Sequence, residues 1–95
     1  MILEVAILNV HAHRTADFES SFAQAAPLIA ASPGYVSHEM RRCVEVANRY
    51  ILLVTWQSIE DHVVGFRGSD AYQSWKALLH HYYDPFPTVE HYEQL

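Results

Sequence analysis

Histidines are the side chains of this sequence best suited to chemistry, and three of the seven lie in HHYYDPFPTVEHY, residues 80–92. A zinc site on a helix needs histidines at positions i and i+4, whereas His80 and His81 are adjacent and would point about 100° apart. His11 and His13 share one side of a strand end, but no third ligand stands at a suitable spacing. The spacing therefore predicts no metal site, and it predicts solvated surface positions for His11, His13 and His80.

The sequence also lacks the signatures of nucleophilic catalysis and of nucleotide cofactors. The segment RGSD, residues 67–70, has no strand-to-helix elbow of the G-x-S-x-G kind, and Ser69 is better suited to capping a helix. Cys43 is the only cysteine, and we expect it to be a small buried hydrophobe. Neither G-x-G-x-x-G nor a P-loop is present, so the sequence predicts no nucleotide, flavin or other cofactor.

His62 lies on an apolar helix face and is the best catalytic candidate. Apolar residues at three- and four-residue steps turn it toward the core: Ile59, Val63 and Phe66. We predict that His62 lines a cavity together with Asn9, Phe66, Tyr72 and Trp75. Ligand sites are usually apolar with a few convergent polar groups, which fits this set. The alternative is a core histidine that is satisfied by hydrogen bonds among packing aromatics.

The elements that must position these residues begin with ILEVAILNV, residues 2–10, an apolar run that predicts a strand ending at HAHR. The two-residue period of a strand gives it two faces. One face holds Leu3, Val5, Ile7 and Asn9. The other holds Ile2, Glu4, Ala6, Leu8 and Val10. From Thr15 apolar residues recur at three- and four-residue steps, which predicts an amphipathic helix that ends at SPG, residues 32–34.

Two strands should follow as a hairpin, residues 35–45 and 49–57, joined by a short turn. The segment SIED resembles a capping box with Ser58 as N-cap, which predicts a short helix after it. A longer helix begins after RGS and stops at DPFP, because residues before proline avoid helical backbone. TVEHY, residues 88–92, closes the chain as a strand. The order β-α-β-β-α-β predicts the ferredoxin-like α+β fold, with helices on one face of a four-stranded antiparallel sheet.

Both faces of the predicted strands are apolar. With all helices on one face, a monomer would expose the other face to water and should make it polar. A large exposed apolar patch marks an interface, so we expect two sheets to pack face to face in a homodimer.

The composition indicates one packed domain over residues 1–95, with 51% hydrophobic and 18% charged residues. The formal charge of −5 and six scattered Lys and Arg argue against nucleic acid as a partner. No run approaches the ~18 apolar residues of a membrane span, and no signal peptide is evident. With a single cysteine, a reducing cytoplasm fits best.

Several stretches of the sequence are distinctive: the opening ILEVAILNV, the turn SPGYVSHE, the passage W-x-S-x-E-D-H (56–62) leading into F-R-G-S-x-x-Y-x-x-W (66–75), and P-x-V-E-H-Y (87–92). Together they resemble the antibiotic biosynthesis monooxygenase domain family over nearly the whole chain. The resemblance implies a homodimeric α+β barrel with a pocket in each monomer between sheet and helices. It also implies that DPFPTVEHY is an arm carrying the last strand into the dimer, with its aromatics at the interface and not in the active site.

The resemblance further implies a cofactor-independent monooxygenase that oxidises a small aromatic substrate, phenolic or quinone-like, with molecular oxygen. In that case His62 would take the phenolic proton, Asn9 would support the reduced oxygen, and Phe66, Tyr72 and Trp75 would form the walls. The haem-degrading branch of the family uses an Asn, a Trp and a His, of which only Asn9 is matched, so haem degradation is disfavoured. The competing hypothesis is a non-catalytic binding or structural dimer of the same fold.

Overall fold

The computed structural model describes residues 1–95 and has the predicted order of elements. The strands are β1 (Ile2–Asn9), β2 (Tyr35–Arg42), β3 (Arg49–Trp56) and β4 (Val89–Glu93). The helices are α1 (Thr15–Ala30), the π-helix η2 (Asp61–Phe66) and α2 (Asp70–Leu79). Short 3₁₀ turns, η1 (Ala12–Arg14) and η3 (His80–Tyr82), precede α1 and follow α2. The second helical region is therefore broken in two, as predicted.

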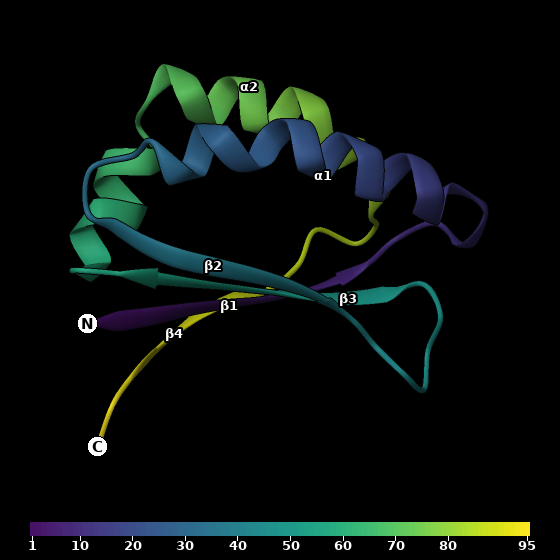
Figure 1. Ribbon diagram of the computed structural model, residues 1–95, viewed down its shortest axis with the longest axis horizontal. Helices are drawn as coiled ribbons and strands as arrows, with labels where there is room; N and C mark the ends of the chain where they lie inside the picture. The colour runs from purple at the N-terminus through teal and green to yellow at the C-terminus, as the bar shows by residue number, and fades with distance from the viewer.

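The four strands form one antiparallel sheet in the order β2-β3-β1-β4. β1 lies inside it and pairs with β3 along its whole length, from Ile2↔Trp56 to Asn9↔Arg49. β4 covers only the first part of the other edge of β1, from Ile2↔Glu93 to Ala6↔Val89. Figure 1 shows α1 and α2 side by side on one face of this sheet. The predicted ferredoxin-like α+β fold is confirmed.

The core lies between the sheet and these helices, and the two-residue period of the strands sets its composition. Ala6 and Leu8 of β1, and Val10 just after its end, are buried on the side of the helices, with Tyr50, Leu52, Val54 and Trp56 of β3. From α1, Phe18, Ala25 and Ile29 complete the layer and are at most 1% exposed. Burial of a large apolar side chain contributes about 1.5–3 kcal/mol, so this layer supplies most of the stability.

The face of the sheet turned away from the helices is also apolar. Val5 lies opposite Leu53, and Ile7 opposite Ile51, in the register of β1 and β3. Ile7 is 48% exposed, and the other three are partly exposed. We call these four residues the outer apolar patch. Nothing in the single chain covers it.

The turn between α1 and β2 is fitted closely to the start of η2. Gly34 has φ +84°, and a Cβ at this position would lie 2.2 Å from the carboxyl group of Asp61, so only glycine fits. The amide of Asp61 donates to Ser58 Oγ at 3.2 Å, and Ser58 Oγ donates to Asp61 Oδ2 at 2.9 Å. Ser58 thus caps this helical segment as the sequence predicts, and the turn fixes where η2 begins.

The π-helix η2 decides which side chains face the core. Its i→i−5 bond, from the amide of Arg67 to the carbonyl of His62 (3.1 Å), makes the turn wider than that of an α-helix. His62 and Phe66 are both buried, as predicted. Ile59 and Val63 were expected beside them but are 38% and 40% exposed.

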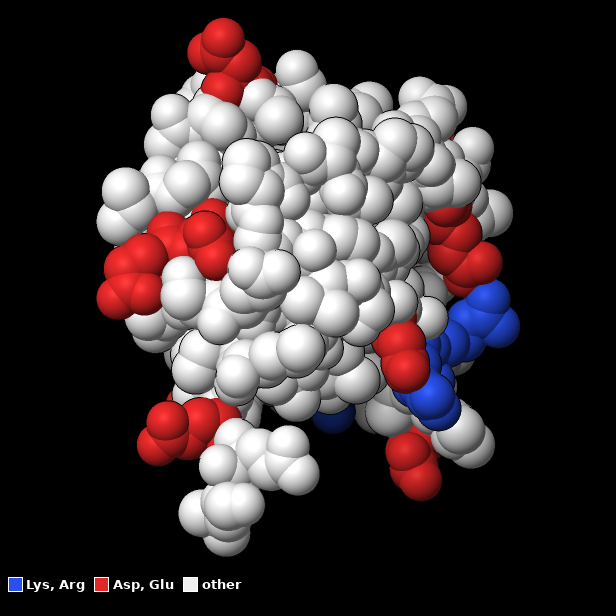
Figure 2. All heavy atoms as spheres, turned by 60° about the vertical axis from the view of Figure 1, so that its left-hand side comes forward, with Lys and Arg blue, Asp and Glu red and all other residues white.

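Charged side chains are sparse on the surface. Figure 2 shows acidic groups scattered around a broad uncharged area, with Lys and Arg at the lower right and at the bottom of that view. No helix in the structure is both long and apolar enough to cross a bilayer.

Candidate functional site

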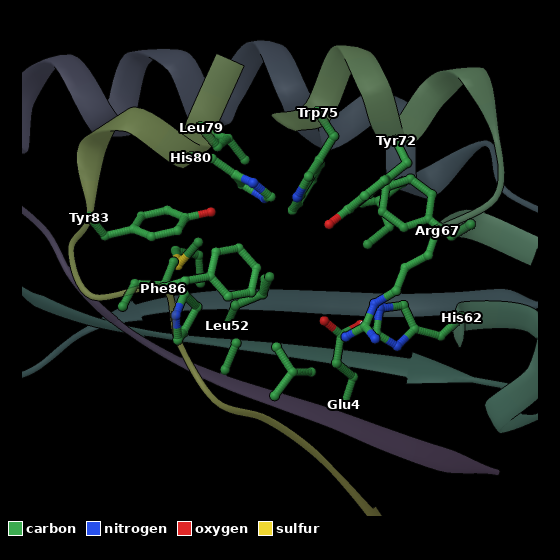
Figure 3. A pocket seen from close by; sticks show the side chains of 17 residues that line it. Glu4, Leu52, His62, Arg67, Tyr72, Trp75, Leu79, His80, Tyr83 and Phe86 are labelled. Atoms are coloured by element: carbon green, nitrogen blue, oxygen red, sulfur yellow. The ribbon is translucent and has the colours of Figure 1, made fainter. Parts of the chain in front are cut away.

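A cavity of about 40 Å³ lies between α2 and the sheet (Figure 3). Tyr72, Trp75 and Leu79 of α2 form its upper wall, and Leu52 of β3 lies in the wall below. The segment after α2 closes one side with His80, Tyr83 and Phe86. Its lining is mostly hydrophobic, which is typical of sites for small organic ligands.

One end of the cavity is polar. Glu4 and His62 are its polar residues there, 5% and 3% exposed, and they are the only buried residues of the chain outside the hydrophobic core. Glu4 Oε1 accepts a hydrogen bond from Trp56 Nε1 at 2.9 Å and lies 3.3 Å from His62 Nε2. The other ring nitrogen, His62 Nδ1, is hydrogen-bonded to His91 Nε2 at 2.8 Å. We call Glu4, His62 and His91 the buried polar chain.

The register between β1 and β4 brings the residues of the buried polar chain together. Glu4 of β1 lies opposite His91 of β4, so both side chains point to the same face of the sheet, where η2 brings His62 between them. His91 is only partly buried, so the buried polar chain runs from the cavity toward solvent.

Burial suppresses charge in the buried polar chain. It lowers the pKa of His62 to about 3, with the positive charge of Arg67 and the neighbouring His91 as smaller causes. Burial also raises the pKa of Glu4, against the opposing effects of the Trp56 hydrogen bond and Arg67. The pKa of His91 is lowered by burial and by Arg67. His62 is therefore neutral at physiological pH, and the carboxyl oxygen of Glu4 favours the tautomer that carries its proton on Nε2.

Other polar groups face the cavity without a protein partner. The guanidinium of Arg67 makes no side-chain hydrogen bond or ion pair, although it lies near enough to Glu4 and His62 to influence both. The hydroxyl groups of Tyr72 and Tyr83 point toward each other across the cavity (Figure 3). Burial, and secondarily the charge of Lys76, lowers the pKa of His80. The cavity thus offers donors and acceptors at both ends of an apolar middle.

Four of the five residues predicted from the sequence are brought together here. His62, Phe66, Tyr72 and Trp75 all line the cavity, and Phe66 packs edge-on against the rings of Tyr72 and Trp75 at 5.5 and 5.6 Å. Their catalytic and binding roles remain predictions.

Asn9 does not line the cavity, and its predicted position was wrong. It lies on the face of β1 that points away from the helices, where its Oδ1 accepts a hydrogen bond from Arg49 Nε at 2.9 Å. The two-residue period already separates Asn9 from Glu4, and the helices cover the face that holds Glu4. Glu4 is the cavity residue of β1 that the sequence reasoning missed.

The segment of residues 80–92 also required correction. His80 was predicted to be at the surface and the aromatics of DPFPTVEHY, residues 84–92, to be interface, yet His80 and Phe86 line the cavity, together with Tyr83. The reason is that α2 ends at Leu79 and the tighter turn η3 changes the direction of the side chains. The density of aromatics in HHYYDPFPTVEHY was the available signal.

His38, which the sequence could not place, lies outside the cavity. Its Nδ1 is hydrogen-bonded to the hydroxyl of Tyr35 at 2.6 Å, and it faces a groove between α1 and β2. No group of three or more His, Cys, Asp and Glu side chains in the structure is close enough to share a metal ion.

The volume of the cavity is small compared with that of ordinary ligand sites. A volume of about 40 Å³ has room for a few water molecules at most, since one needs about 10–15 Å³. Sites for drug-sized ligands measure roughly 300–1,000 Å³. An aromatic ligand therefore requires side chains of the wall to move.

We expect the low pKa of His62 to make stability pH-dependent. The folded protein holds this pKa at about 3 against an ordinary value of 6.5, so between these values the unfolded chain takes up a proton that the folded chain does not. This difference in proton uptake has little effect above pH 6.5, and it lowers the free energy of unfolding progressively as pH falls from 6.5 toward 3. Glu4, whose pKa is raised, acts in the opposite direction as pH falls toward 4.5.

The comparison of wild type with His62→Leu isolates this effect. The free energy of unfolding of wild type minus that of His62→Leu, measured by urea unfolding, should be about 2 kcal/mol lower at pH 5 than at pH 7. An unchanged difference would mean that His62 titrates alike in the folded and unfolded chains.

Known proteins share this sequence and arrangement. The family model described as antibiotic biosynthesis monooxygenase matches residues 1–78. The chain is 48% identical to YczJ of Bacillus subtilis strain 168, an uncharacterised protein, over 95 residues and 100% of both chains.

Two solved structures are similar in fold and sequence. A homologue of antibiotic biosynthesis monooxygenases from Bordetella bronchiseptica is 35% identical, with a TM-score of 0.94 over 99% of this chain and 96% of that one. A mutant of SnoaB, a cofactor-independent oxygenase from Streptomyces nogalater, is 25% identical, with a TM-score of 0.76 over 96% and 87%.

Proposed function

Because the chain belongs to the antibiotic biosynthesis monooxygenase family, we propose that it oxidises a small aromatic molecule, phenolic or quinone-like, with molecular oxygen and without a cofactor. The observation that carries the proposal is the buried polar chain at the end of an aromatic-lined cavity. Two ionisable residues in an apolar core are costly to fold, which favours a functional reason for them. SnoaB, a similar protein, is a cofactor-independent oxygenase.

Oxidation begins with loss of the phenolic proton. A phenol whose hydroxyl lies against Glu4 gives its proton to this carboxylate, and the hydrogen bond between His62 Nδ1 and His91 Nε2 offers a path toward solvent. The nearby positive charge of Arg67 stabilises the phenolate. Because both ring nitrogens of His62 have protein neighbours, His62 acts as a relay when its proton shifts to Nδ1: Nε2 then accepts the proton from Glu4 and Nδ1 donates its own to His91.

The remaining chemistry needs only the substrate and oxygen. The phenolate gives one electron to O₂, and the resulting superoxide and phenoxyl radical join as a peroxide on a ring carbon, which takes back the proton that the phenol lost and becomes a hydroperoxide. Loss of water then leaves the quinone. One phenol and one O₂ yield one quinone and one water, so the substrate supplies all the electrons. Arg67 takes the role of supporting reduced oxygen that the sequence had suggested for Asn9, which lies on the other face of the sheet.

Aromatic side chains would hold the substrate. Phe66, Tyr72 and Trp75 stand nearly perpendicular to one another in two pairs, forming flat walls for a planar ring. Haem degradation is not proposed, since Asn9, the one residue matching that branch of the family, is outside the cavity.

The competing function is a non-catalytic ligand-binding or structural dimer. The small volume of the cavity favours it, because side chains fill the space that a substrate would need. We propose a homodimer under either function, formed through the outer apolar patch. A cytoplasmic location is part of the same proposal.

Oxygen uptake tests the proposed function. Protein purified without a His-tag, treated with a chelator and free of flavin, should consume oxygen with at least one member of a panel of phenols and hydroquinones, at one O₂ per phenol and without peroxide. Haem serves as the comparison substrate. Uptake that appears only after flavin or metal is added would contradict cofactor independence. No uptake with any compound would favour the binding or structural function.

A further inference from the structure

A short segment of the chain separates the cavity from a second hollow on the outer face of the sheet. Phe86 and Pro87 line both the cavity and this hollow, which measures about 280 Å³ and which we call the outer hollow. Val5 and Ile7 of the outer apolar patch line the outer hollow as well. The cavity and the outer apolar patch thus lie on the two sides of one segment.

Few bonds hold this segment in place. Residues 84–87 lie outside every helix and strand and make no backbone hydrogen bond. Phe86 packs edge-on against His80 of the cavity, with ring centroids 4.9 Å apart (Figure 3), yet it remains 58% exposed. Segments with few buried contacts and few hydrogen bonds open locally at low cost in free energy. In the single chain, the cavity is therefore only weakly closed on this side.

We propose that a second copy of this chain supplies the outer side of this wall: in the homodimer it covers Phe86 in the outer hollow and holds the cavity closed there. The inference rests on the homodimer proposed above. The site is then incomplete in one chain, although all the residues that line it belong to that chain. The widening that an aromatic ligand requires falls to another wall, such as Met40 of β2, whose unbranched side chain has three rotatable bonds.

The outer face suits a second copy because its apolar centre has opposite charges at its two edges. Arg41 of the edge strand β2 lies opposite Ile51, and Glu90 of the edge strand β4 lies opposite Val5, so both share the face of the outer apolar patch. Two sheets that face each other across a two-fold axis along the strands place the β2 edge of each over the β4 edge of the other. Arg41 then meets Glu90 of the partner subunit at both edges. Because Glu90 lines the outer hollow, this ion pair forms close to Phe86.

Quenching of tryptophan fluorescence by acrylamide tests the proposal without any substrate. Trp75 lines the cavity and is 6% exposed, so acrylamide reaches it when a wall opens. Leu53→Glu, which should separate the subunits, lies on the outer face and not in the cavity. Covering the exposed half of a phenylalanine should make openings at least about fivefold rarer, so the quenching rate constant should rise about fivefold in this variant. Ala23→Glu, on the exposed side of α1, should change nothing.

A charge reversal covers the case in which Leu53→Glu does not fold. Arg41→Glu should weaken the dimer in sedimentation and raise the quenching rate constant. Adding Glu90→Arg to the same chain should restore both, because the two charges attract again in exchanged positions. Trp75→Phe assigns the signal, since the difference between dimer and monomer should vanish with it.

The proposal is overturned if dimeric wild type and a folded monomeric variant are quenched alike, which would leave the homodimer itself intact. It is also overturned if the difference persists in Trp75→Phe, or if wild type sediments as a monomer, which would remove the homodimer as well. No turnover is required, so a failure of the oxygen-uptake experiment does not affect this result.

Discussion

Replacing His62 with alanine is expected to lower the rate of oxygen uptake by about 10²–10⁴, the usual loss when a proton-transfer group is removed. The substitution breaks the buried polar chain in the middle, so a proton received at Glu4 no longer has the hydrogen-bonded path to His91. The fold should survive, because the Trp56 hydrogen bond still satisfies Glu4 and the strands keep their register. The measurement is uptake on the best substrate of the panel, with the melting temperature and circular dichroism of each variant.

A matched control separates catalysis from general damage. His13→Ala removes an exposed histidine in η1 and should leave the rate unchanged. If His62→Ala lowers the melting temperature but keeps most of the rate, His62 is a core histidine with a structural role, and the relay is wrong. His91→Gln should slow uptake less than His62→Ala and shift its pH profile, because only the connection to solvent is altered.

Replacing Leu53 with glutamate is expected to convert the proposed homodimer to a monomer. Leu53 lies in the outer apolar patch, opposite Val5, and is partly exposed in the single chain. A carboxylate there meets solvent in the monomer but would be buried and unpaired between two sheets, which costs several kcal/mol. Wild type should sediment as a dimer at micromolar concentration, and Leu53→Glu as a folded monomer.

The control for the dimer places the same charge on the helical side. Ala23 is exposed on α1, so Ala23→Glu should leave sedimentation unchanged. A wild-type protein that sediments as a stable monomer would show that the outer apolar patch is simply exposed in solution.

The sequence predicted the fold because the periodicity of apolar residues along each helix and strand depends only on neighbouring positions. The alternation in residues 2–10 separates the two faces of β1 correctly, and the capping residues Ser58 and Ser69 occupy the predicted positions. The pattern does not say which strand face the helices cover. Because the pattern left the face undecided, we placed Asn9 in the cavity instead of Glu4, and this prediction was wrong.

The rest of the candidate site depends on contacts between distant segments. His62 and His91 meet only because β4 pairs with β1 in a register that places His91 beside Glu4. No spacing along the chain between residues 62 and 91 encodes that contact. His80 was misplaced for a different reason, since helical periodicity was extended one residue beyond the end of α2. Pairing register and helix ends are where sequence reasoning failed.

The π-helix η2 makes one wall of the cavity sensitive to the length of the chain. Removing one residue between His62 and Phe66 would restore ordinary α-helical winding and leave these two side chains three residues apart, about 60° apart around the helix axis. A related chain one residue shorter between Ser58 and Ser69 would therefore direct this pair of side chains differently toward its ligand, even if every other cavity residue were identical. Insertions and deletions, and not only substitutions, can diversify substrate choice on this scaffold.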